Sequence, residues 1–147
     1  MRWLAVDYGH KRVGLATGYE ADGFATPVKM IPGGHDDRVI REILVAVKQF
    51  ACGGIVVGWP INMDNSEGPQ AIKTREFAAE LARQAVEHHI RLDVRMWDER
   101  LSSFHADGVL AGTLTRGKRK ARQDAIAAAA ILNAFFDDDG PQKAQKP

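Results

Sequence analysis

The sequence RWLAVDYGHKRVGLATG, residues 2–18, contains two short apolar runs on either side of a turn. The first run, Arg2–Asp7, ends in a carboxylate, and the second, Arg12–Gly18, has small residues at alternate positions. A third run, Thr26–Ile31, begins next to Pro27, where a strand loses no ladder donor. The three runs predict three consecutive antiparallel strands.

Downstream of these strands the apolar residues adopt a helical spacing, and short apolar strands then alternate with helices. The predicted elements are a helix over 36–50, a strand over 54–58, a helix over 69–89, a strand over 91–99, a short helix over 102–110 and a last helix over 123–136. We therefore expect an α/β fold whose mixed five-stranded sheet combines three antiparallel strands with βαβ units and is flanked by helices. Residues 1–137 are expected to form a single domain, and residues 138–147 a flexible tail.

Composition excludes several classes of protein. The 147 residues are 45% hydrophobic and 27% charged, which is typical of a globular domain. No apolar run approaches the ~20 residues of a membrane helix, so we expect no membrane partner. The single cysteine, Cys52, cannot form an internal disulfide, which favours the cytoplasm. The net charge is only +1, but five basic residues are concentrated in the predicted loop RGKRKAR, residues 116–122. The charge distribution therefore does not exclude a polyanionic partner.

Four carboxylates lie at positions where sheets of this kind bind ligands. Asp7 ends the first strand, Asp98 and Glu99 end the last strand, and Asp124 opens the final helix just before several alanines. Ligand sites in open α/β sheets lie outside the carboxyl ends of strands, and small residues would let the helix approach the sheet. Converging carboxylates suit Mg²⁺ or Mn²⁺. The alternative is structural, because Asp commonly caps helices and occupies turns.

Four blocks of the chain resemble, in the same order, the motifs of the YqgF family, which is also called RuvX. The blocks are DYGHKRVGLATG (7–18), VVGWPINMDNSEGPQA (56–71), DERLSS (98–103) and RKARQDAIAAAAIL (119–132). Two positions depart from the family pattern. Trp59 stands where a smaller apolar residue is common, and Asn65 replaces a loop glycine, a change that Asn tolerates because it can adopt left-handed backbone.

The resemblance implies an RNase H-like fold and a metal-dependent endonuclease that uses two Mg²⁺ or Mn²⁺ ions. The substrate would be either a Holliday junction or the 5′ end of pre-16S rRNA. Catalytic metal ligands would be Asp7, Asp124 and either Glu99 or Asp98. Glu99 ranks higher because RuvC-type resolvases have a glutamate at the end of this strand.

Nucleic-acid contacts are expected from the turn, the second and third blocks and the basic stretch. The candidate residues are Lys11, Arg12, Asn62, Ser66, Arg100, Lys118, Arg119 and Lys120. Simpler interpretations stay open: a solvated turn for Lys11 and Arg12, a helix cap for Ser66, a brace within the loop for Asn62, and a solvated loop for the basic stretch. Symmetric cleavage of a four-way junction would also require a homodimer.

Two other functions compete with the nuclease. The motif DYGHKRVG also resembles the phosphate-binding hairpin of actin-like ATPases, but those proteins bind ATP between two such domains and this chain supplies one. A non-catalytic nucleic-acid-binding factor for ribosome assembly, with structural carboxylates, is the stronger alternative. The sequence leaves DNA or RNA, the oligomeric state and the choice between Mg²⁺ and Mn²⁺ open.

Overall fold

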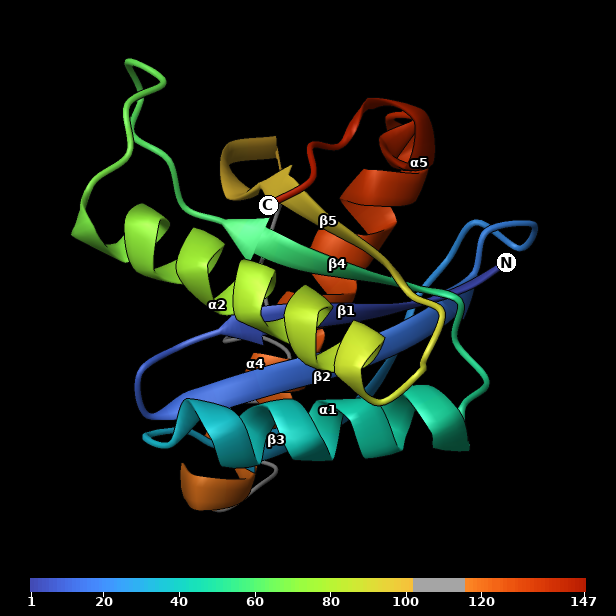
Figure 1. Ribbon diagram of the computed structural model, residues 1–147. Coiled ribbons are helices and arrows are strands. Elements are labelled where there is room, and N and C mark those ends of the chain that lie inside the picture. Colours follow the sequence, from blue (N-terminus) through green and yellow to red (C-terminus); the bar gives the residue numbers. More distant parts are fainter. Residues whose placement is uncertain (102–115) are drawn as a thin grey trace.

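A computed structural model of the chain describes residues 1–101 and 116–147, with the backbone alone for residues 116–122. Its centre is a five-stranded sheet in the order β3-β2-β1-β4-β5 (Figure 1). The strands are β1 (Arg2–Tyr8), β2 (Arg12–Tyr19), β3 (Thr26–Pro32), β4 (Gly54–Trp59) and β5 (Asp93–Asp98). β2 is antiparallel to both β1 and β3, while β4 is parallel to β1 and β5 is parallel to β4. The predicted mixed sheet is therefore confirmed.

Helices cover both faces of the sheet, because the strands are apolar on both sides. One face packs against α1 (Asp36–Gln49) and α2 (Pro69–Glu87), and the other packs against α4 (Arg116–Asp137), as Figure 1 shows. Neighbouring residues of a strand point to opposite faces. Thus Leu4 and Val6 lie in the core beside α1, while Trp3 and Ala5 lie in the core beside α4. No helix in the described ranges is long and apolar enough to span a membrane.

The basic stretch corrects one prediction. Residues 116–122 were expected to form a loop before a helix at 123, but they form the first turns of α4. Arg, Lys and Ala favour helices, and their propensity outweighs the single glycine at position 117. Asp124 consequently lies inside α4 instead of opening it. The short helix predicted over 102–110 lies outside the described residues.

The C-terminal residues also differ from the expected flexible tail. After α4 the chain forms a short helix, α5 (Gly140–Lys143), and then runs beside β5. The Met96 amide donates to the Gln145 carbonyl over 2.7 Å, and Arg95 donates to the Ala144 carbonyl over 2.8 Å. Ala144 is buried in the core on the α4 side. The end of the chain therefore packs on the sheet and pairs with its outer strand.

Candidate active site

Asp7, Glu99 and Asp124 lie near one another at one end of the sheet, on the face that packs against α4. Asp7 follows Trp3 and Ala5 at the alternate positions of β1 that face α4. Glu99, in the 3-10 helix η1 (Glu99–Leu101), comes two residues after Trp97, which also lies on this side. Asp124 reaches the same place from α4. Carboxylates from two strand ends and one helix therefore share a small region.

Two glycines make this approach possible. Gly14 pairs with Asp7, and a Cβ on Gly14 would lie 1.9 Å from the backbone oxygen of Asp124, so α4 can cross β2 only where a side chain is missing. Gly58 lies on β4, between β1 and β5, and a Cβ there would lie 2.5 Å from Oε1 of Glu99. The absent side chain of Gly58 thus opens the path by which Glu99 reaches across β4 towards Asp7.

The carboxyls of Asp7 and Glu99 interact with each other, and the pKa of each is raised. Burial, followed by the charge of Asp124, raises the pKa of Asp7 to about 6, although the hydrogen bond from Glu99 opposes this shift. Burial, followed by the charge of Asp7, raises the pKa of Glu99 to about 7. Both shifts have the same physical origin: partial burial and the charge of a nearby acid disfavour the ionised form of each carboxyl.

Asp98 takes no part in this pair, although its charge contributes to the raised pKa of Glu99. Its carboxylate instead accepts hydrogen bonds from Arg100, including one of 2.6 Å from Nη2. Partial burial raises the pKa of Asp98, but the hydrogen bonds from Arg100 outweigh it and the net shift is downward. Of the two alternatives left open by the sequence, the structure brings Glu99, and not Asp98, to Asp7.

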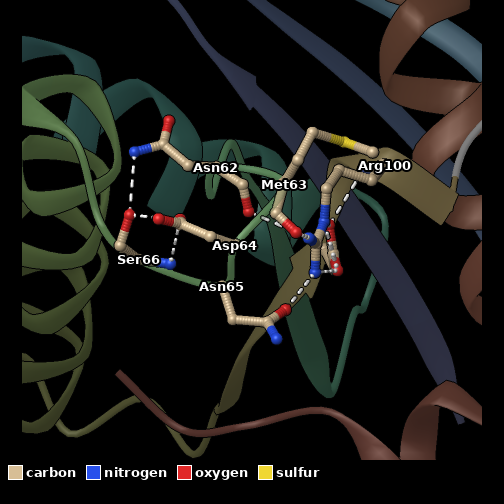
Figure 2. A network of polar contacts seen from close by, with 7 residues as sticks. Asn62, Met63, Asp64, Asn65, Ser66 and Arg100 are labelled. Carbon is tan, nitrogen blue, oxygen red and sulfur yellow. Dashed lines mark hydrogen bonds and ion pairs between the residues drawn. The ribbon is translucent and has the colours of Figure 1, made fainter.

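Arg100 was predicted to contact nucleic acid, but its guanidinium is engaged within the protein. Besides Asp98, it donates to the carbonyl oxygens of Asn62 and Met63 over 2.9 and 3.2 Å, and to Oδ1 of Asn65 over 2.8 Å. Figure 2 shows these bonds joining the end of β5 to the loop after β4. Arg100 therefore fixes this loop to the sheet.

The loop itself is held by its own polar groups. The Asn62 side chain donates to Oγ of Ser66 over 3.0 Å, and both the amide and the hydroxyl of Ser66 donate to Asp64 (Figure 2). Asn65 has a φ of 69°, the left-handed backbone expected where the family has glycine. The N-cap of α2 is Gly68, so the interpretation of Ser66 as a helix cap is wrong. Asn62 does brace the loop.

The two basic residues of the first turn differ in their surroundings. Lys11 is exposed between β1 and β2. Arg12 lies on the face that packs against α4, two residues before Gly14, and its Nε is 2.9 Å from Oδ2 of Asp124. Three candidates remain, and the structure describes only their backbone. They lie in α4, one to two turns before Asp124: Lys118, Arg119 and Lys120.

The donor chemistry of the site fits a hard divalent cation. Asp7, Glu99 and Asp124 supply oxygen ligands only, and two of them carry raised pKa values that a nearby cation would lower. Among the residues that the structure describes, no three His, Cys, Asp or Glu side chains are yet grouped closely enough to hold an ion. Of the three carboxylates, Asp124 is the one that forms an ion pair, with Arg12.

Comparison with solved structures defines the class of the fold. The chain aligns over its whole length, and over 99% of the other chain, with "T. thermophilus RuvC in complex with Holliday junction substrate", with a TM-score of 0.59 and 14% identity. A second solved chain, "Thermus thermophilus RuvC structure", gives a TM-score of 0.55 at 14% identity, with 100% of both chains covered. The fold is therefore the RNase H-like fold of RuvC.

Sequence comparison then gives the family. The family model described as "RuvX: Holliday junction resolvase" matches residues 1–138. A curated protein of Opitutus terrae, named "Putative pre-16S rRNA nuclease", is 34% identical over 148 residues, which cover 100% of this chain and 99% of that protein. A protein of the same name from Geobacillus kaustophilus is 35% identical, with 93% and 98% covered. The chain belongs to the RuvX family, and the prediction of a nuclease from its motifs is confirmed.

Proposed function

We propose that the chain is a divalent-metal-dependent endonuclease whose catalytic carboxylates are Asp7, Glu99 and Asp124. The observation that carries this proposal is the pair of Asp7 and Glu99, two half-buried acids with raised pKa values that Gly58 allows to approach each other at the carboxyl ends of β1 and β5. Burying two like charges together without a cation is unfavourable, and a structural role would not require it. Asp98, whose charge is paired with Arg100, is left out of the ligand set.

The reaction is hydrolysis of a phosphodiester bond. Two Mg²⁺ or Mn²⁺ ions would supply an activated water on one side of the phosphorus and stabilise the leaving oxygen on the other. Asp7, Glu99 and Asp124 would together hold these ions. Lys11 and Arg12, which follow Asp7 in the turn after β1 and at the start of β2, would orient the phosphate. The first turns of α4, which contain Lys118, Arg119 and Lys120, would follow the backbone of the nucleic acid without reading its sequence.

The substrate that we favour is a precursor of 16S rRNA, because the curated relatives at 34–37% identity are named as pre-16S rRNA nucleases. The four-way DNA junction named in the family description is the competing substrate. Its symmetric cleavage would need two active sites, and therefore a homodimer. Processing at one end of an rRNA precursor needs a single site.

One experiment separates these outcomes. The purified protein is incubated with Mg²⁺ or Mn²⁺ and with labelled rRNA leader, four-way junction or linear duplex, next to the Asp7→Asn variant. We expect cleavage of the leader by the wild type alone. Paired symmetric nicks in the junction would instead identify a resolvase. RNA binding that needs no metal, with no cleavage of any substrate, would overturn the nuclease in favour of an assembly factor.

A further inference from the structure

The contact between Arg12 and Asp124 has an unusual place for a surface ion pair. Nε of Arg12 lies 2.9 Å from Oδ2 of Asp124, across 112 positions of sequence, and it joins a residue expected to bind phosphate to one expected to bind metal. The side chains are 39% and 24% exposed, so solvent and ligands reach the pair. A phosphate oxygen and the Asp124 carboxylate are therefore competing acceptors for the same guanidinium.

The backbone leaves Asp124 little freedom apart from its side chain. α4 is in contact with β2 at Gly14, where the Asp124 carbonyl occupies the space of a missing Cβ, so the helix cannot move closer to Asp7. Gly14 pairs directly with Asp7, and Arg12 lies two residues away on the same face of β2. A change of side-chain rotamer is therefore the movement left to bring the Asp124 carboxylate from Arg12 towards Asp7.

We propose that Arg12 is a positioning residue that holds Asp124 away from the other two acids until a phosphate of the nucleic acid takes its place. Asp124 then turns to Asp7 and Glu99 and completes the set of ligands. This inference rests on the proposed metal-dependent function, and it adds that metal binding and nucleic-acid binding strengthen each other. A cation would thus be held firmly only when a phosphodiester is present to be cleaved.

The first test measures Mn²⁺ binding to the protein without nucleic acid, by titration calorimetry. Freeing Asp124 with Arg12→Gln should tighten Mn²⁺ binding about two- to fivefold, the range expected for losing a partly exposed ion pair. Asp124→Asn should weaken binding, and adding Arg12→Gln to Asp124→Asn should then change nothing further. Lys29→Gln, which removes one positive charge from the exposed side of β3, is the matched control and should leave the affinity unchanged.

Each result of this cycle bears on the inference. If Arg12→Gln tightens Mn²⁺ binding equally in the Asp124→Asn background, the effect is one of net charge and the inference is wrong. If Arg12→Gln leaves the Mn²⁺ affinity unchanged while the wild type binds Mn²⁺, the inference is wrong and the proposed function stands. If no variant binds Mn²⁺ even when the four-way junction is added, both are wrong.

The second test measures the coupling itself. Fluorescence anisotropy of a labelled four-way DNA junction is followed with and without Ca²⁺, a cation that also prefers oxygen ligands. The wild type should bind the junction more tightly with Ca²⁺, because coupling between two ligands is reciprocal. In Arg12→Gln the ratio of the two affinities should fall to that of Asp124→Asn. An unchanged ratio would contradict the exchange of partners.

Discussion

Asp98 and Glu99 are adjacent in sequence and have opposite electrostatic surroundings. Asp98 accepts several hydrogen bonds from one arginine and has a lowered pKa, whereas Glu99 contacts another acid and has a pKa raised to about 7. Both lie where β5 ends, so position at a strand end alone does not make a carboxylate functional. The difference is the counter-charge: the protein provides it for Asp98 and leaves it to a ligand for Glu99.

The largest effect expected from this difference is on cleavage. Asp7→Asn should reduce the rate of phosphodiester cleavage more than about a thousandfold, which corresponds to about 4 kcal/mol of transition-state stabilisation. The reason is that Asp7 is the central carboxylate of the proposed ligand set. Asp98→Asn, the matched control at the other kind of acid, should reduce the rate less than about tenfold. Single-turnover assays with labelled substrate measure both. Comparable losses would mean that Asp98 also belongs to the catalytic set.

The next largest effect concerns the path of Glu99 across β4. Gly58→Val places a branched side chain where Oε1 of Glu99 and the Ile131 side chain now lie, at 2.5 and 2.6 Å from the new Cβ. Cleavage should fall more than about a hundredfold, and the overpacking should cost about 1–3 kcal/mol of stability. Gly68→Ala is the matched control, because its Cβ makes only ordinary contact with Asn62.

Denaturant unfolding and cleavage assays of the two glycine variants check this prediction. If Gly58→Val keeps wild-type cleavage while losing stability, Glu99 has another route to Asp7, and the glycine serves packing alone.

The pH dependence of stability gives a third, smaller effect. Asp7 and Glu99 have folded pKa values of about 6 and about 7, above their ordinary values of 3.8 and 4.5, so between these limits the folded state binds more protons than the unfolded state. The free energy of unfolding of the metal-free protein should therefore fall by about 1–3 kcal/mol as the pH rises from about 4 to 7.

Denaturant titrations at several pH values measure this slope, and two changes should flatten it. Asp7→Asn removes one of the two charges, and saturating Mg²⁺ supplies the missing counter-charge. A slope in Asp7→Asn as steep as in the wild type would assign the pH dependence to other groups.

The smallest effect is expected when Asp98 loses its partner Arg100. Arg100→Gln removes the hydrogen bonds that Arg100 donates to Asp98, to Asn65 and to the loop carbonyls. The amides of residues 62–66 should therefore exchange hydrogen faster. Mn²⁺ affinity should change less than about twofold, because Arg100 and Asp98 lie outside the proposed set of metal ligands. Hydrogen exchange and calorimetry check the two halves of this prediction. A large loss of Mn²⁺ affinity would show that the loop also orders Glu99.

The sequence predicted most of the strands and helices, because their apolar periods are regular. It also narrowed the last-strand acid to two neighbours, but the choice between them depends on which face each side chain takes. Alternation along β5 could have indicated the choice, since Trp97 and Glu99 share one parity and Met96 and Asp98 the other. The role of Gly58 has a weaker signal, a glycine at the end of an otherwise bulky buried strand.

Two parts of the fold were beyond sequence reasoning for different reasons. The run of charges over 116–122 indicated a solvated loop, although its residues individually favour a helix. The C-terminal residues attach to β5 partly through main-chain groups, and backbone pairing of this kind leaves no pattern of side chains to find. The ion pair between Arg12 and Asp124 depends on where α4 crosses β2, and that is set by Gly14.

The C-terminal pairing also governs how copies of this chain can meet. Gln145 takes up an amide on the outer side of β5, while the opposite border of the sheet, β3, carries Pro27 and Pro32, which have no N–H, and the exposed Lys29. Both borders are therefore poor templates for joining the sheets of two molecules, a common route to aggregation. A dimer able to cut a symmetric junction would have to form through the side chains of helices or loops. Deleting residues 141–147 should uncover β5 and promote fibrous or insoluble assemblies.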